Sequence, residues 1–305
     1  MINDLTFCGW RVHSELSLPE LCKWTGDVRE PDVTISYADS RVCCERSSPD
    51  AQPLSLLTHV CPDGAWCLNV PTVGKFIVRR GKEILISPTR FASAGDLRLF
   101  ALGPALAICC AQRRLLPIRA TTMVRRDGAV AICGEPGVGK SAVSLLLSLS
   151  EYKLLSDGLS VLVPPAESRC TKALATHPFF FLWRAATDAL GIVSTELAQP
   201  RQCLEKFVCA INSDRFDPYL STELGHIVIL VRRSAMSTSM ASLVDAEEVF
   251  RRLQRFVYFQ HSHHWSINTS NVFLSLKDVA ATTRVHTIAM ENERDAAKVI
   301  EDLLA

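Results

Sequence analysis

Short runs in which hydrophobic and polar residues alternate fill the first part of the chain, and such runs are typical of half-buried strands. Strands are expected at residues 32–35, 66–70, 76–78 and 83–86. Arg80-Gly81-Lys82 between the last two runs predicts a hairpin turn, and Pro88 closes the series. Residues 1–92 are therefore expected to form a small β-rich N-terminal domain.

The pattern changes to helical spacing over residues 96–112, where Leu97, Leu102 and Ile108 share an apolar face. Strands and helices then alternate, which predicts an α/β domain over residues 93–305. Further strands are expected at residues 118–124, 129–133, 153–156 with a continuation over 159–163, 207–211 and 226–231. Helices are expected at residues 140–150, 181–190, 245–259 and 293–304.

Composition narrows the classes of protein that fit this pattern. Of the 305 residues, 48% are hydrophobic and 21% charged, which excludes a mainly disordered chain. The net charge is +1, so no field of one sign favours nucleic acid or an anionic membrane as a partner. The longest apolar run, from Leu99 to Cys110, is shorter than the roughly 20 residues that span a bilayer. We expect no nucleic-acid and no membrane partner.

The cysteines bear on the cellular compartment. There are 12 of them, but no Cys-x-x-Cys pair occurs, and Cys43/Cys44 and Cys109/Cys110 are adjacent in sequence. Adjacent cysteines have poor geometry for an ordinary disulfide. The sequence from Met1 to Leu5 has neither the charged nor the apolar region of a secretion signal. We therefore expect reduced thiols in a cytoplasmic protein.

The strongest motif is a glycine-rich loop of the form G-x-x-x-x-G-K-[ST], the P-loop or Walker A motif. It reads Gly134-Glu135-Pro136-Gly137-Val138-Gly139-Lys140-Ser141 and is followed by Ala142. An apolar strand precedes the loop and an apolar helix follows it, as a phosphate cradle requires. The glycines let backbone N–H groups face phosphate oxygens, Lys140 reaches the β- and γ-phosphates, and the hydroxyl of Ser141 can bind Mg²⁺. The motif predicts ATP and Mg²⁺ as ligands; a plain glycine turn and a dinucleotide fingerprint are weaker alternatives.

An acidic residue near the metal is also needed. The first downstream strand that ends in an acid is Leu154-Leu155-Ser156-Asp157. Asp157 is therefore a candidate metal ligand or general base, with a solvated turn aspartate as the alternative.

Two other segments are weaker candidates for a functional site. His261, His263 and His264 lack an acid or cysteine at ligand spacing and are interpreted as a polar loop, and Phe179–Trp183 is interpreted as core that could border a substrate groove.

These motifs together resemble the HPr kinase/phosphorylase superfamily, and more narrowly the HPr-kinase-related bacterial proteins. The resemblance is strong over residues 116–162 and weak over the rest. It is carried by Leu116–Ala120, Gly128, the loop, and Leu154–Gly158, and the opening Gly9–Leu21 is similar to the start of those proteins. It implies a small N-terminal β domain and a P-loop core built like HPr kinase and phosphoenolpyruvate carboxykinase. It also implies transfer of the ATP γ-phosphoryl group to a serine, and an assembly of several copies of the chain. Some relatives phosphorylate the C-terminal residue of lasso-peptide precursors.

Two positions depart from the pattern of the family. Arg119 stands where the family usually has His, and Gly158 follows Asp157 where the family usually has a second Asp. Either Asp157 does the work of both acids, or another residue substitutes, or transfer is slow. Arg119 could neutralise charge on the transferring group, or it could be a salt-bridged strand residue.

The sequence therefore predicts an ATP- and Mg²⁺-dependent kinase resembling HPr kinase. Its acceptor is a serine or another hydroxyl of a peptide, a protein or a small molecule. Lys140, Asp157 and Arg119 are the candidate catalytic residues, and Ser141 and Asp157 the candidate metal ligands. The alternative is a regulatory or scaffold protein of the same fold that binds nucleotide without transferring phosphate. A transporter or motor ATPase ranks last, because the strand over 226–231 ends in Arg232-Arg233 rather than in acids.

Overall fold

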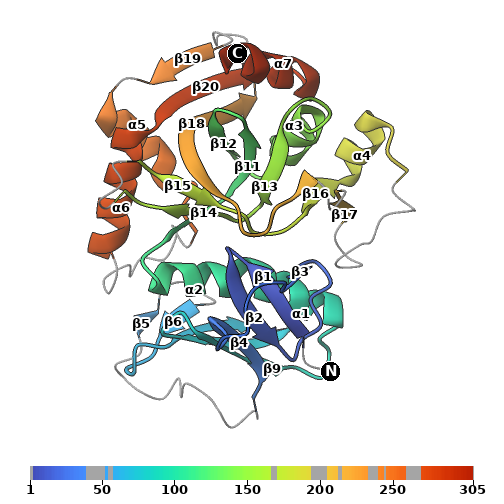
Figure 1. The fold of residues 1–305 in the computed structure, drawn as a ribbon, viewed down its shortest axis with the longest axis vertical. Coiled ribbons are helices and arrows are strands. Elements are labelled where there is room, and N and C mark those ends of the chain that lie inside the picture. The colour runs from blue at the N-terminus through green and yellow to red at the C-terminus, as the bar shows by residue number, and fades with distance from the viewer. Residues whose placement is uncertain are drawn as a thin grey trace.

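A computed structural model of the chain describes residues 3–38, 52–53, 58–165, 170–193, 205–211, 215–232, 240–243, 245–258 and 269–304. Two large β-sheets, each of nine strands, make up most of this part, and helices pack between and around them (Figure 1). The fold is therefore mixed α/β. A smaller two-stranded sheet and a short helix stand beside the second large sheet.

The first sheet comes from the N-terminal third of the chain. Its strands are β1 (Asn3–Phe7), β2 (Trp10–Ser14), β3 (Cys22–Lys23), β4 (Val33–Tyr37), β5 (Gln52–Pro53), β6 (Thr58–Val60), β7 (Trp66–Val70), β8 (Gly74–Arg79) and β9 (Glu83–Pro88). The four predicted strands are confirmed as β4, β7, β8 and β9. The predicted hairpin is confirmed too, since β8 and β9 pair antiparallel with Arg79 opposite Glu83.

A helical segment follows and covers this sheet. It consists of α1 (Ala94–Phe100), a π-helical turn η1 (Ala101–Ala105) and α2 (Leu106–Gln112). The side chain of Ser93 caps α1 by accepting from the N–H of Asp96, and Pro104 lies in the π-helical turn, where a wider turn accommodates the missing N–H. The segment packs on the first sheet and shares its core. The side-chain amide of Gln112 also donates a hydrogen bond to the carbonyl of Val78 on β8, at 3.0 Å.

The position of this segment bears on two expectations. The predicted division at residue 92 stays a prediction, but the helix that was assigned to the second domain buries its apolar face in the core of the first sheet. Taken as one helix, Ala94–Gln112 is long and apolar enough to cross a membrane by length and composition alone. In the structure it lies between the two sheets, with 56% of its most apolar window buried (Figure 1).

The second sheet holds the predicted loop. Its strands are β10 (Leu116–Ile118), β11 (Ala120–Arg125), β12 (Gly128–Gly134), β13 (Lys153–Asp157), β14 (Ser160–Val163), β15 (Lys172–Leu174), β18 (Ser221–Arg232), β19 (Met240–Leu243) and β20 (Arg284–Met290). β11 and β12, two of the expected strands, pair antiparallel as a hairpin with Arg125 opposite Gly128. β12, β18 and β20 run parallel, so their C-terminal ends meet at one edge.

Alternation along β12 explains how both faces of this sheet are covered. Val130 and Ile132 face a core that includes α3 (Lys140–Leu147) and α7 (Glu293–Leu303). Ala129, Ala131 and Cys133 face the opposite core, built with α5 (Ala246–Gln254) and α6 (Thr269–Thr282). A strand buried on both faces reads as a continuous apolar run, which is what the sequence shows here.

Several predicted boundaries differ from the structure. The helix expected from residue 181 begins only at α4 (Arg184–Leu190), because β16 (Phe179–Trp183) pairs with β17 (Lys206–Ala210). Aromatic residues favour strands when a partner strand is available. Residues 160–163 form a separate strand rather than a continuation of β13, because Gly158 turns the chain at a φ of +78°. The histidines at 261–264 lie outside the described residues.

The cysteines follow the expectation with one exception. The described cysteines apart from Cys61 are thiols that form no disulfide, and Cys8, Cys67, Cys109, Cys110 and Cys133 among them are buried. Cys61 is disulfide-bonded, so the expectation that all cysteines are reduced is wrong at this position.

The packing of the 94–112 segment can be tested with a matched pair of leucines. Leu106 on α2 is fully buried, whereas Leu149 after α3 is 75% exposed. We expect Leu106→Ala to lower the free energy of unfolding by about 2–5 kcal/mol, because it leaves a cavity. Leu149→Ala should change it by less than about 0.5 kcal/mol. Urea unfolding of both variants is the measurement, and equal losses would contradict the packing described here.

Candidate functional site: a glycine-rich loop beside a buried aspartate

The glycine-rich loop joins β12 to α3, as the sequence predicts. Gly134, Gly137 and Gly139 have backbone φ values of +152°, +80° and +112°, which residues other than glycine rarely adopt. A Cβ at Gly134 would lie 2.7 Å from Cγ1 of Val138, so the strand end and the loop touch directly. Gly137 has no atom within 4 Å of its Cβ position, so the loop faces open space there. A phosphate group needs this open space beside backbone N–H groups.

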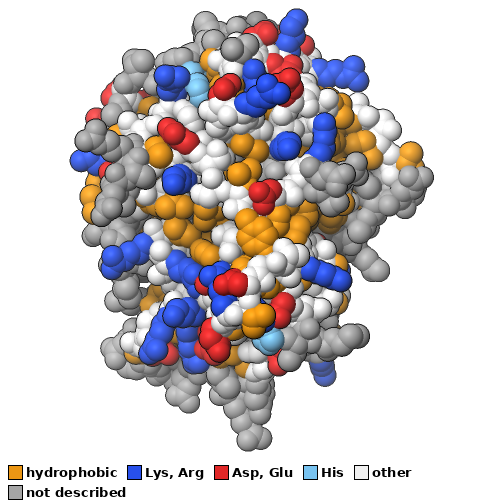
Figure 2. Space-filling view, in the orientation of Figure 1, with side chains coloured by type: hydrophobic (Ala, Val, Ile, Leu, Met, Phe, Trp, Pro, Cys, Tyr) orange, Lys and Arg blue, Asp and Glu red, His pale blue; other side chains and the backbone are white. Residues whose placement is uncertain are grey.

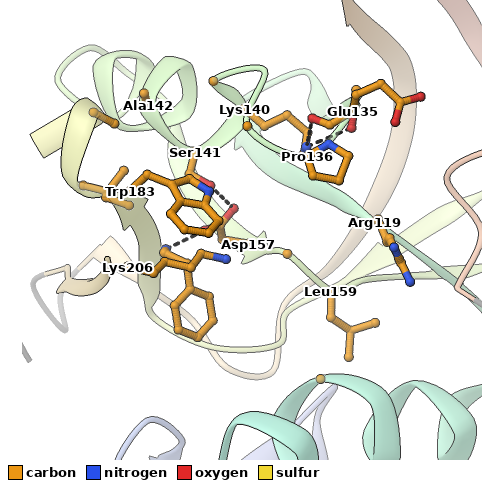
Figure 3. Close-up of a pocket in the computed structure, with 18 of the residues that line it drawn as sticks. Arg119, Glu135, Pro136, Lys140, Ser141, Ala142, Asp157, Leu159, Trp183 and Lys206 are labelled. Atoms are coloured by element: carbon orange, nitrogen blue, oxygen red, sulfur yellow. Dashed lines mark hydrogen bonds between the residues drawn. The ribbon is translucent and has the colours of Figure 1, made fainter. Parts of the chain in front are cut away.

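Lys140 folds back over the start of the loop. Its ammonium donates to the carbonyls of Gly134 at 2.8 Å and Glu135 at 3.0 Å (Figure 3). Burial lowers the pKa of Lys140, and the charge of Asp157 is among the smaller effects that oppose this shift. The lysine is thus held at the end of the loop where the β- and γ-phosphates of a nucleotide bind in loops of this type.

Asp157 is the most constrained polar residue of the site. It ends β13 and is only 1% exposed. Its Oδ1 accepts hydrogen bonds from the hydroxyls of Thr121 at 2.5 Å and Ser141 at 2.8 Å. Its Oδ2 accepts from the backbone N–H of Phe181 at 2.6 Å. Three donors from three separate elements therefore orient one carboxylate.

The residues present fit a magnesium ion. Oxygen ligands of Mg²⁺ lie 2.0–2.1 Å from the ion at the corners of an octahedron, so adjacent ligands are about 2.9 Å apart. The 2.8 Å between the Ser141 hydroxyl and Asp157 Oδ1 matches that spacing. Among the described residues no group of three or more His, Cys, Asp or Glu could hold a metal without help. An ion here would complete its shell with phosphate oxygens and water, as Mg²⁺ does in nucleotide sites.

A cavity of about 820 Å³ opens in front of the loop. The loop and Asp157 line one side of it, and Leu99, Leu102 and Pro104 of the 94–112 segment line the side that faces them. Figure 2 shows hydrophobic side chains gathered in the hollow between the two halves of the molecule. The cavity is large enough for a nucleotide together with part of a second substrate.

Arg119 lines the same cavity but lies apart from Asp157. It sits between β10 and β11, on the far side of Glu135 and Pro136 from Ser141 (Figure 3). Its guanidinium lies over the ring of Tyr258, 5.1 Å from the centroid, and pairs with no carboxylate among the described residues. The structure therefore gives no support to the salt-bridge alternative. Arg232 and Arg255 line the cavity as well.

Gly158 explains why a second acid is absent next to Asp157. Its φ of +78° reverses the chain between β13 and β14. A Cβ there would meet only Cδ2 of Phe181, at 3.9 Å, so space is available but the backbone conformation disfavours a side chain.

The cavity wall also includes His177 and Lys206, which no sequence pattern pointed to, and Trp183, the last residue of the aromatic run. Burial lowers the pKa of His177 to about 4, and its ring stacks on Phe179 at 4.0 Å, so it is neutral. Burial also lowers the pKa of Lys206, while Asp157 acts in the opposite direction. The aromatic run of β16 was the one sequence signal near these residues, and the open alternative that it borders a groove agrees with its place in the cavity wall.

No model of a protein family matches the chain, and no curated protein matches it. Among solved structures, the chain is similar to an HPr(Ser) kinase/phosphatase from Coxiella burnetii, with 13% sequence identity and a TM-score of 0.33. That match covers 62% of this chain and 87% of the other. At this level of similarity, only the residues of the site itself carry weight for function.

Two neighbouring threonines test whether Asp157 is held as a charged group. Thr121 donates to the Asp157 carboxylate, whereas Thr122 donates to the neutral hydroxyl of Ser160 at 2.8 Å, and both are fully buried. Hydrogen bonds to charged groups contribute about 1.5–3 kcal/mol and neutral ones about 0.5–1.5 kcal/mol. Thr121→Val should therefore destabilise the protein more than Thr122→Val in chemical unfolding. The reverse order would show that the carboxylate does not depend on its donors.

Proposed function

We propose that the chain is an ATP- and Mg²⁺-dependent phosphotransferase resembling HPr kinase, with a hydroxyl group as acceptor. The observation that carries the proposal is the hydrogen bond between Ser141 and Asp157, beside Lys140, at the mouth of a glycine loop. In this proposal the Ser141 hydroxyl and the Asp157 carboxylate bind the metal and the Lys140 ammonium binds phosphate, and all three residues line one cavity. Few functions other than binding a metal–triphosphate use all three.

Each residue has a task in this proposal. The N–H groups of the loop and of the first turn of α3 bind phosphate oxygens, and Lys140 exchanges its carbonyl partners for the β- and γ-phosphates. Ser141 and Asp157 hold the metal. When bound, Mg²⁺ supplies positive charge that neutralises the phosphates in transfer.

The hydrogen bonds of Asp157 favour a metal-binding role over that of a general base. Both of its oxygens already accept hydrogen bonds, and Thr121 and Phe181 belong to the rigid walls of the site. Phosphoryl transfer passes through a loose transition state, so positioning and charge stabilisation supply most of the catalysis. One fixed carboxylate can therefore serve where the resembling family has two.

The arginine side of the cavity suits the acceptor. Arg119, Arg232 and Arg255 come from three separate segments and line the cavity. Arg119 lies on the Glu135 side of the loop (Figure 3), and Arg255 lines a second, smaller pocket together with Glu135. The γ-phosphate would lie at the Glu135 end of the loop, so an acceptor hydroxyl must approach from here. A peptide, a protein segment or a small molecule with an apolar body fits the apolar wall formed by Leu99, Leu102 and Pro104.

Gly158 favours a second candidate function. Because no acid stands at this position, the chain could bind nucleotide and act as a regulatory or scaffold protein without transfer. Wild-type protein that binds Mg-ATP tightly but releases no ADP would favour this second function.

Nucleotide binding can be tested without knowing the acceptor. A ligand at a hundredfold excess over its Kd stabilises the native state by about 2.7 kcal/mol, which corresponds to a rise in Tm of roughly 5–10 °C for a domain of this size. We expect Mg-ATP to produce this shift and AMP to produce much less, because the loop binds the β-phosphate and beyond. Lys140→Ala should remove most of the shift. An unchanged Tm with millimolar Mg-ATP would sink both candidate functions.

Catalysis is tested separately by Asp157→Asn, which keeps the size of the side chain and removes its charge. We expect ATP to bind within a few-fold of the wild type, while ADP release falls by at least about 100-fold, the usual loss when one electrostatic stabiliser is removed. Steady-state ADP release and equilibrium ATP binding give the two readouts. Full turnover in this variant would show that Asp157 is not the metal-binding acid.

A further inference from the structure

We propose that Trp183 and Lys206 form the nucleoside end of the nucleotide site: the Trp183 ring stacks on the base, and the Lys206 ammonium contacts the phosphate nearest the ribose. The proposal deepens the function above and rests on it.

The direction of the bound nucleotide follows from Lys140. Its ammonium marks the Gly134–Glu135 end of the loop as the place of the β- and γ-phosphates. The phosphate chain must then run toward the other end of the loop, over Ser141 and Ala142, so the α-phosphate and the nucleoside lie on that side. Figure 3 shows Trp183 and Lys206 on this side and Arg119 on the opposite one.

Trp183 offers a flat aromatic ring, held at the end of a paired strand, to a ligand in the cavity. It ends β16, directly opposite Lys206 in the pairing with β17, and its neighbour Arg184 begins α4. The side chain is 43% exposed although it lines the cavity, so part of a large aromatic surface is left without protein contact. Stacking of a base on such a ring is favourable for every base, because each base has a π-face.

Lys206 is a cation held beside aromatic rings. Its ammonium lies 4.8 Å from the centroid of the Phe181 ring and 5.7 Å from that of Trp183. It has no hydrogen bond or salt bridge to any residue that the structure describes. Burying a lysine among aromatic rings is costly unless a negative charge comes to it. The α-phosphate would supply that charge.

Two probes separate the base from the phosphates: Mg-ATP and Mg-tripolyphosphate, which has the three phosphates and no nucleoside. In calorimetric titrations, Trp183→Ala should weaken Mg-ATP binding by about 5- to 150-fold and leave Mg-tripolyphosphate binding unchanged. Trp183→Phe should recover most of the affinity. Lys206→Met should weaken both probes by about 10-fold or more, because both carry the phosphate that it contacts.

A control variant and a measurement on the wild type distinguish a loss of binding from a loss of folding. Phe91→Ala removes an aromatic side chain that is 73% exposed and lies outside the cavity lining, so it should change neither affinity. A second measurement does not depend on any variant folding well: Mg-ATP should quench wild-type tryptophan fluorescence, and Mg-tripolyphosphate should not.

The outcomes are distinct. If the wild type binds both probes and Trp183→Ala weakens neither, or weakens both equally, the assignment of Trp183 to the base is overturned while the proposed function stands. Loss of tripolyphosphate binding in Lys206→Met supports the phosphate contact, and unchanged binding overturns it. If the wild type binds neither probe, the proposed function itself fails.

Discussion

One buried carboxylate holds the site together. Asp157 lies at the end of β13, and its three hydrogen bonds reach Thr121 on β11, Ser141 on α3 and Phe181 on β16. A buried charge is tolerated only when donors surround it, so these three elements must stay in register for the protein to fold. The same requirement fixes the first turn of the helix after the loop relative to the strand that carries the acid. Stability and the proposed chemistry thus depend on the same contacts.

The two ends of the cavity, on either side of Asp157, are lined by different kinds of residue. The loop and Asp157 lie in the middle, Trp183 and Lys206 lie toward Ala142, and Arg119 lies toward Glu135 (Figure 3). The helical segment 94–112 closes the cavity from the other half of the molecule while its apolar face is buried on the first sheet. Both halves therefore contribute to one cavity, and the proposed acceptor would meet residues of each.

Local sequence patterns were enough to find the loop and Asp157, because a strand, a glycine turn and a helix follow one another without a break in residues 129–147. The aromatic run pointed to Phe179–Trp183 as a segment that could border a groove, but patterns of this kind could not reveal Lys206, since the pairing of β16 with β17 brings it beside Trp183 from a separate part of the chain. The sequence suggested a helix from residue 181. The pairing of β16 with β17 makes Phe181–Trp183 a strand instead. An amphipathic face likewise predicted the helix at 96–112, but it could not say which of two sheets the helix covers.

A crystal structure with Mg²⁺ and a non-hydrolysable ATP analogue tests the central claim most directly, because the claim concerns where one metal lies. The account predicts a metal about 2.0–2.1 Å from the hydroxyl oxygen of Ser141, with Asp157 binding it directly or through one water. The β- and γ-phosphates should lie against the loop, with Lys140 turned from the carbonyls of Gly134 and Glu135 toward them. A nucleotide bound elsewhere, or an Asp157 that keeps all three donors while the metal lies remote from it, would contradict the account.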